Sequence, residues 1–156
     1  YYAKEVFVQI STKFTIAVHL LTAVAYFSES QKVTSDFLAG SIGSNPVIIR
    51  NIMGQLKEAG LIDIKRGPGG VTLEKKLTDI SFLDIYKAVE TNSEEVLFRF
   101  HENPNPLCPI GRTIHKSLDG ALEEIQKNFE VELSKWTLAD VYENSLEELR
   151  KEKQNE

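Results

Sequence analysis

Two helix-start signals with a glycine-containing turn between them constrain this chain more than any other feature. Thr34-Ser35-Asp36 precedes a short apolar run that Gly43 ends, and hydroxyl or carboxylate side chains there can accept from the free N–H groups of a first turn. Asn45-Pro46 begins a second helix, since Pro is tolerated at the first helical position. Gly60 is its expected terminator. Two helices joined by a glycine-containing turn within residues 34–59 form a helix–turn–helix layout.

A small hairpin is predicted directly after these two helices. Residues 61–65 and 71–74 are strand candidates, and they flank the turn Arg66-Gly67-Pro68-Gly69-Gly70. A two-stranded hairpin with a basic tip at this place makes the module a winged helix. The glycine run is no nucleotide-binding loop, because the chain has no G-x-x-x-x-G-K-S/T pattern.

Four further segments show helical spacing of apolar residues. One starts at Ser11 or Thr12 and ends near residue 27, and one spans residues 80–89 behind Thr78 or Ser81. The longest is expected to start at Cys108-Pro109, and Thr137 should cap a last helix that ends in a charged, frayed tail over residues 150–156. The apolar stripe of the long helix consists of Ile110, Ile114, Leu118, Leu122, Ile125, Phe129 and Leu133.

These elements predict a mainly α fold with a small β wing. We expect a winged helix–turn–helix DNA-binding domain over residues 11–90, a sensor-type loop over 91–109 and a helical dimerisation region over 110–150. One subunit has little else to cover the long apolar stripe, so we expect a homodimer. Residues 1–10 show no clear amphipathic pattern and are assigned no element.

Charge is distributed unevenly along the chain. The net charge is −5, but residues 11–77 carry eight Lys/Arg and five Asp/Glu, whereas residues 91–156 carry eight basic and fourteen acidic residues. A basic front half on an acidic back half is typical of a DNA-reading module joined to an assembly module. No run is long and apolar enough to span a bilayer and no secretory signal is seen, so we expect a cytoplasmic protein without a membrane partner.

The DNA-binding residues follow from how a helix–turn–helix docks. The N-terminal residues of its second helix face base edges in the major groove, while helix N-termini and basic side chains hold phosphates. A wing arginine can enter a narrow minor groove, and glycines let the backbone approach DNA closely. Double-stranded DNA is therefore the expected partner, bound through Lys13, Thr34, Ser35, Asn45, Val47, Arg50, Asn51, Arg66, Gly67 and Gly69.

The same residues resemble the Rrf-two family of bacterial transcription factors over about residues 11–135. The resemblance is carried, in order, by KFTIAVHLL (13–21), VTS (33–35), SNPVIIR (44–50), LKEAGLI (56–62), RGPGG (66–70) and ISFLDIYKAVE (80–90). It implies a winged-helix homodimer whose long helix crosses its partner, and repression or occasionally activation at palindromic operators. Iron–sulfur members carry three clustered cysteines, whereas this chain has only Cys108. The stretch HENPNPLCPIG (101–111) is similar to a cluster-free branch, so no cofactor is expected.

Cys108 is a candidate regulatory residue. If Pro109 starts the long helix, Cys108 is its N-cap, where the helix dipole lowers a thiol pKa. The hypothesis is a redox- or electrophile-sensing thiol, with a small-molecule or oxidant signal; the alternatives are an apolar filler or a plain cap. His101, Cys108 and His115 match no compact ligand spacing, so no metal site is expected.

Two other function classes were weighed against a DNA-binding regulator. No nucleophile elbow, phosphate loop or paired carboxylates suggest an enzyme, so no catalytic residue is named. The other class is a protein-interaction adaptor that uses the winged-helix scaffold without DNA. An adaptor should expose an apolar groove on the front half, whereas a DNA reader should expose a positive face.

Overall fold

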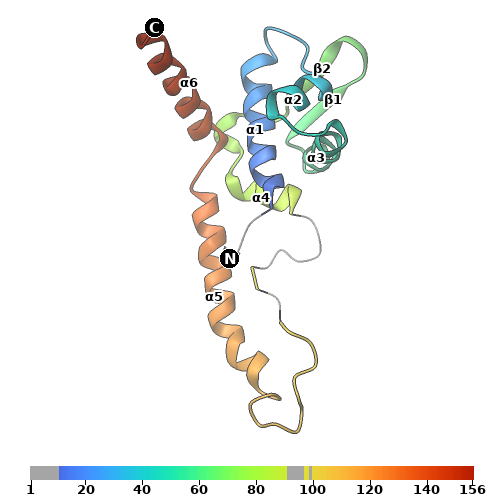
Figure 1. Cartoon of the computed structure of the whole chain (residues 1–156), viewed down its shortest axis with the longest axis vertical. Helices are drawn as coiled ribbons and strands as arrows, with labels where there is room; N and C mark the ends of the chain where they lie inside the picture. The colour runs from blue at the N-terminus through green and yellow to red at the C-terminus, as the bar shows by residue number, and fades with distance from the viewer. Residues whose placement is uncertain (1–10, 91–96, 99) are drawn as a thin grey trace, which may run out of the picture.

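The computed structural model describes residues 11–90, 97–98 and 100–156, and it confirms the mainly helical fold with a small antiparallel wing (Figure 1). Residues 1–10 and part of the expected sensor loop, 91–96 and 99, lie outside the described residues. The helices and strands, in chain order, are α1 Thr12–Phe27, α2 Ser35–Ile42, α3 Pro46–Glu58, β1 Ile62–Lys65, β2 Gly70–Leu73, α4 Phe82–Val89, α5 Ile114–Ser134 and α6 Leu138–Gln154.

The predicted caps of the front half form hydrogen bonds in the structure. The Ser11 hydroxyl accepts from the Lys13 amide at 3.0 Å and the Thr34 hydroxyl accepts from the Phe37 amide at 3.1 Å. Ser81, the second of two proposed starts, forms a reciprocal capping box at the start of α4. Gly43 ends α2 in the left-handed region at φ 71°. Local sequence chemistry therefore sets both ends of the turn between α2 and α3.

The hydrophobic core lies between α1, α2, α3 and α4, and it includes one residue from the far end of the chain. Leu20, Leu21 and Ile49 are fully buried, and so is Leu138, the first residue of α6. The Leu138 amide also donates to the Ile80 carbonyl at 2.8 Å. Although Leu138 was assigned to the dimerisation region, it belongs to the core of the winged-helix domain and anchors α6 there.

The wing is attached to the chain just before α2. Strands β1 and β2 pair antiparallel, with Ile62 opposite Leu73. β1 begins one residue later than predicted, and β2 begins and ends one residue earlier than predicted. The Val71 amide donates to the Val33 carbonyl at 2.9 Å. A Cβ on Gly70, whose φ is +64°, would lie 2.7 Å from that carbonyl oxygen. Gly70 is therefore required by this close backbone approach.

The predicted start of the long helix is wrong. Helix α5 begins at Ile114 behind Thr113, so Cys108 is not its N-cap and Ile110 precedes it. Residues 106–113 form irregular turns instead, in which the Cys108 amide donates to the Asn105 carbonyl at 3.2 Å. The chain folds back so closely that a side chain at Gly111 would meet the Asn105 backbone. The Arg112 amide still donates to the Cys108 carbonyl at 3.0 Å, so a single turn forms around Pro109, but it is not part of α5, which begins at Ile114.

The last helix extends further than expected. Thr137 forms a capping box with Asp140 at the start of α6, as predicted, but the helix continues to Gln154 instead of fraying from residue 150. Lys151 lies 3.6 Å from Glu147 and 3.0 Å from Glu148, one turn earlier, and such pairs support an exposed helix. Among the described helices, none has the length and apolar character needed to cross a membrane.

Candidate nucleic-acid interface

Helix α3 presents a mixed polar and apolar surface at its first two turns. Val47 is 58% exposed and Ile48 43% exposed, while Arg50 and Asn51 are also exposed. Ile49 is fully buried and fixes the opposite face of the helix in the core. Because the N-terminal turns of such a helix enter the major groove, these four exposed side chains are candidates for contact with base edges.

Ile48 was missed in the sequence analysis. It lies off the i, i+3, i+4 stripe that defined the apolar face of this helix, so it was assigned neither to the core nor to the interface. Its exposure beside Val47 adds to the apolar surface at the start of α3. Two adjacent exposed apolar residues in a helix start that also carries Asn51 are the signal that could have found it.

Arg50 has one charged neighbour. Its Nη2 lies 3.7 Å from the Asp36 Oδ1 on α2, and both side chains are mostly exposed. Exposed pairs of this kind contribute about 0–1 kcal/mol, whereas a bidentate arginine–guanine contact gives about 1–3 kcal/mol of discrimination. Arg50 can therefore leave Asp36 for a base at a small cost.

Two of the proposed DNA contacts also cap helices. The Asn45 Oδ1 accepts from the Val47 amide at 2.8 Å, and the Thr34 hydroxyl is bonded to the Phe37 amide. The side-chain oxygens of both residues are thus used as acceptors in the caps. The groups that remain available are the Asn45 side-chain N–H groups and the Thr34 O–H. Both groups are donors, which suits phosphate oxygens and base acceptors.

Lys13 lies next to the recognition surface although it comes from another helix. Together with Ile48, Asn51 and Gln55 it lines a shallow hollow of about 400 Å³ between the start of α1 and the face of α3. Lys13 is exposed and Ser35, at the start of α2, is half-buried. The structure thus brings Lys13 of α1 close to Asn51 of α3.

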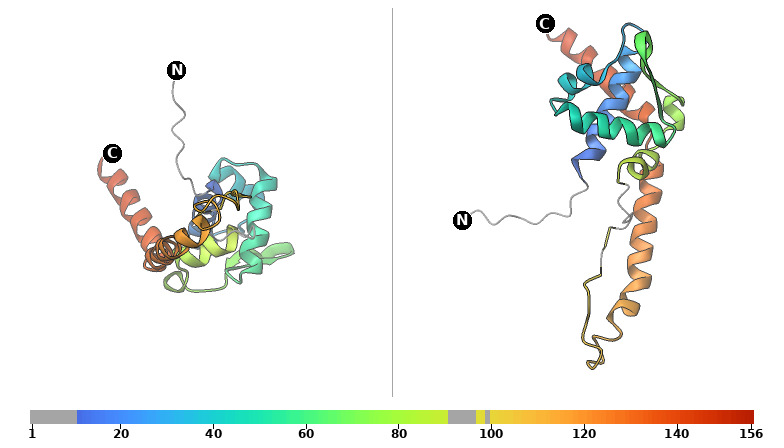
Figure 2. Two further views of the ribbon diagram at one scale, coloured as in Figure 1. Left: turned by 90° about the horizontal axis from the view of Figure 1, so that it is seen from below. Right: turned by 90° about the vertical axis from the view of Figure 1, so that its right-hand side faces the viewer.

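The wing and α3 project from the same side of the domain, away from α6 (Figures 1 and 2). Arg66, Gly67 and Gly69 are exposed at the tip. Gly67 has φ +81°, but Gly69 is limited by packing, since a Cβ there would lie 2.6 Å from the Lys65 Cβ. Basic residues exposed on this side are Lys13, Arg50, Lys57, Lys65 and Arg66.

Helix α5 extends away from the winged-helix domain (Figure 2) and has no buried residue in the single chain. Ile125 is 46% exposed and Leu118 is also exposed, and Ile110, in the preceding turns, is 67% exposed. Ile114, Leu122, Phe129 and Leu133 are only half-buried. Phe129 has a partner within the same chain, because its ring packs edge-on against Tyr86 of α4 with the ring centroids 5.5 Å apart. In the single chain, three of the seven residues of the predicted stripe are therefore exposed and four are half-buried.

Cys108 is exposed, in the turns that precede α5. His101 and His115 pack ring against ring at 5.1 Å, and His115 also stacks on Phe100 at 4.5 Å. The part of the chain that the structure describes holds no group of three His, Cys, Asp or Glu that could bind a metal ion. These histidines thus lie together without the third ligand that a site would need.

Comparison with known proteins gives one family. The model of the Rrf2 family, the Rrf-two family named above, is described as an iron-dependent transcriptional regulator and matches residues 10–144. YwnA of Bacillus subtilis (strain 168), named as an HTH-type transcriptional regulator, is 38% identical over 132 residues, covering 85% of this chain and 96% of YwnA.

Two crystal structures are also similar. A transcriptional regulator from Lactobacillus plantarum superposes with a TM-score of 0.73 at 25% identity, covering 94% of this chain and all of that one. A protein described as DNA-binding gives 0.66 at 32% identity, covering 83% and 97%. The helices and the wing described above are thus a known arrangement.

The family description raises the question of iron, and the residues do not fit an iron–sulfur cluster. A cluster needs several thiolate ligands, and the whole chain has one cysteine. Cys108 is exposed on a turn, and it belongs to no group of three His, Cys, Asp or Glu among the described residues that could bind a metal ion. A single copy of this chain therefore does not supply the thiolate ligands that such a cluster needs.

Proposed function

Because the chain belongs to the Rrf2 family of transcriptional regulators, we propose that it acts as a homodimeric repressor on a pseudo-palindromic operator. The observation that supports this most is the start of α3, where Val47, Arg50 and Asn51 are exposed and Asn51 shares a hollow with Lys13 of α1. That surface combines hydrogen-bonding groups for base edges with a cation for phosphate. The family consists of regulators rather than enzymes, in agreement with the sequence-based prediction.

Dimerisation is supported by the uncovered stripe of α5. Leu118, Leu122 and Ile125 recur at helical spacing and stay partly or fully exposed in the single chain, a pattern that a second helix covers in coiled-coil packing. Two copies would present two α3 helices to half-sites about 34–36 Å apart, one turn of DNA. A dimer bound there blocks access to the DNA it covers, which is the simplest route to repression.

Cys108 is retained as the proposed contact point for an oxidant or electrophile. The cap argument no longer supports it, because α5 begins at Ile114. What supports it is exposure and its position in the turns that lead into the dimerisation helix. With one cysteine in the chain, an oxidised thiol must pair with Cys108 of the second copy or with a small thiol.

The adaptor alternative predicts no DNA binding, so one experiment separates the two. Sequences bound by the wild-type protein are selected from random DNA, and affinities for the selected operator are measured over a range of salt concentrations. Arg50→Ala should cost about 1–3 kcal/mol per half-site and relax sequence preference, whereas Lys13→Ala should weaken all sequences alike and reduce the salt slope.

Arg150→Ala, on the exposed end of α6, is the matched control and should leave affinity unchanged. Light scattering at micromolar concentration gives the mass of the same samples. A strictly monomeric protein, or selection that enriches no sequence, would contradict the proposal. Operator affinity that survives Arg50→Ala would show that α3 does not read bases in the way described.

A further inference from the structure

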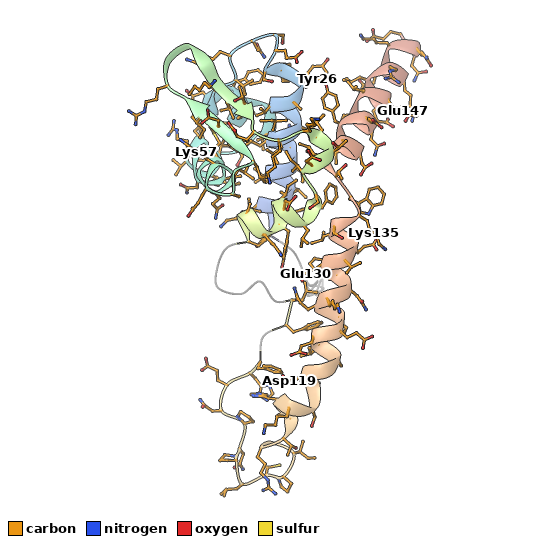
Figure 3. The ribbon with its side chains drawn as sticks, turned by 180° about the vertical axis from the view of Figure 1, so that it is seen from behind. Tyr26, Lys57, Asp119, Glu130, Lys135 and Glu147 are labelled. Atoms are coloured by element: carbon orange, nitrogen blue, oxygen red, sulfur yellow. The ribbon has the colours of Figure 1, made fainter. Side chains whose placement is uncertain are left out.

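The surface around the start of α3 contains one acidic residue among neutral and basic ones. Over residues 34–57, which cover α2 and nearly all of α3, Asp36 is the single Asp or Glu, whereas Arg50 and Lys57 are basic. Acidic side chains of α5 and α6, such as Asp119 and Glu147, lie away from Lys57 and α3 (Figure 3). Because Asp36 pairs with Arg50, it is an acid within the face that is proposed to bind DNA.

Asp36 lies where phosphates are expected. It is in the first turn of α2, directly after Thr34 and Ser35, which are proposed phosphate contacts, and its side chain is 81% exposed. A carboxylate beside phosphates repels them, so it weakens the binding of any DNA unless a cation compensates it. An acid at a helix start also stabilises the helix through the dipole, but that role needs no partner on α3.

Arg50 supplies the compensating charge. Its Nη2 lies 3.7 Å from the Asp36 Oδ1, which is longer than a hydrogen bond, so the pair restrains the guanidinium by charge without using up its N–H donors. A guanidinium has five such donors, and two of them are enough for the N7 and O6 acceptors of guanine. Arg50 can therefore bind guanine while Asp36 stays beside it.

The pair makes guanine and phosphate unequal targets for Arg50. On guanine, the charges of Arg50 and Asp36 still compensate each other. If Arg50 turns to a phosphate instead, Asp36 is left unpaired beside the DNA backbone, and an unpaired charge is costly at an interface from which water is displaced. A repulsive group of this kind raises specificity because it weakens the wrong complexes more than the right one.

We propose that Asp36 is a specificity-determining residue that acts through Arg50. It positions the guanidinium at the base edges and penalises its transfer to phosphate. This role rests on the proposed function, in which α3 reads bases. The DNA-binding surface then has a lower affinity for DNA in general and a higher discrimination at one base pair.

The test compares full-length variants on the selected operator, on that operator changed at one guanine, and on random DNA. The guanine is located as the position whose preference Arg50→Ala abolishes. Asp36→Asn should bind random DNA about threefold more tightly or better, with a salt slope steeper by about one per subunit, since Arg50 becomes a phosphate contact. It should lose about threefold or more of the discrimination at the guanine. Asp36→Glu keeps the charge beside Arg50 and should retain this discrimination.

An Arg50→Ala background separates positioning from other roles of Asp36. There, Asp36→Asn should strengthen binding to all sequences alike and leave sequence preference unchanged, because no guanidinium remains to be positioned. Asp79→Asn is the matched control, since it removes the same charge from an exposed position next to Ile80, whose carbonyl is bonded to the first residue of α6. It should stay within about twofold of wild type on each DNA.

Three results would overturn the role of Asp36. The first is discrimination by Asp36→Asn equal to that of wild type, or an equal loss from Asp36→Glu, which leaves only a charge at a helix start. The second is a loss of preference from Asp36→Asn that persists in the Arg50→Ala background, because Asp36 would then contact a base directly, as a carboxylate can contact cytosine. The third is a sequence preference that survives Arg50→Ala.

The two kinds of failure are distinguishable. Selection that enriches no DNA sequence refutes the proposed function, and the role of Asp36 falls with it. Selection that enriches a sequence, followed by either of the first two results, refutes the role of Asp36 alone and leaves a DNA-binding regulator that reads bases through Arg50.

Discussion

Truncating Val47 should expose how the start of α3 reads DNA. The side chain is 58% exposed beside Ile48 in the first turn of the helix. In the major groove only thymine presents a methyl group, and apolar side chains recognise it by contact. We therefore expect the operator half-site to contain thymine opposite Val47, and Val47→Ala to remove that preference while leaving the helix intact, since Ala is the better helix former.

The size of the effect follows from the surface that is available. Val→Ala removes two methyl groups, worth about 0.8 kcal/mol each on full burial. Since only 58% of the side chain is exposed before binding, complete coverage by DNA gains about 0.9 kcal/mol of this, or roughly fivefold in affinity. A dimer with two such contacts should lose about 1.8 kcal/mol, roughly 20-fold, if the half-sites act independently.

Replacing the thymine by deoxyuridine removes the same contact from the other side, so a double-mutant cycle isolates it. Binding is measured for wild type and Val47→Ala on thymine and deoxyuridine operators. The deoxyuridine operator should weaken wild-type binding severalfold and Val47→Ala hardly at all, and Leu107→Ala, an exposed apolar residue on the loop before α5, should behave as wild type. Equal losses for wild type and Val47→Ala would refute contact between this residue and a thymine methyl.

Three further changes test other parts of the molecule. Gly70→Ala should lower the free energy of unfolding by about 2 kcal/mol or more, because the backbone φ is +64° and an added Cβ would lie 2.7 Å from the Val33 carbonyl oxygen. Thermal melts measure the loss. Gly40→Ala is the control and should not be destabilised, because a Cβ at Gly40 meets nothing within 4 Å. Ile125→Lys should convert the proposed homodimer into a monomer, as measured by light scattering, and a dimeric variant would exclude this face of α5 from the interface. Cys108→Ser should abolish any loss of operator binding after mild peroxide, and equal responses from both proteins would exclude this thiol.

The front half of the molecule could be predicted because its boundaries depend on residues close in sequence. Asn45 caps α3 through the amide two residues later, and Gly43 ends α2 by its own backbone conformation. Such signals operate within one turn and need no tertiary context. The same holds for Thr137, whose capping box with Asp140 forms at the predicted place.

The start of α5 could not be predicted on the same basis. Pro109 is compatible with a first helical turn, but the backbone return at Asn105 and Gly111 brings together residues whose pairing has no local sequence signal. Ile48 was missed for a related reason. Its neighbours Ile49 and Ile52 define the buried side of α3, and only the packed domain shows that Ile48 points away from them.

The groove that α1 and α6 line depends on contacts between residues that lie still further apart in the sequence. Its two walls are separated by more than a hundred residues, and its width is set where Leu138 enters the core and its amide bonds to the Ile80 carbonyl. The sequence shows an amphipathic α6, which by itself predicts only that one face is covered. Anchoring α6 at its first turn leaves the apolar residues of later turns short of a partner. Leu146, in one of these later turns, is only half-buried, whereas Leu138 is fully buried. Leu146→Ala should therefore lower the melting temperature less than Leu138→Ala, which leaves a cavity in the core, and equal losses would contradict this account of how α6 is anchored.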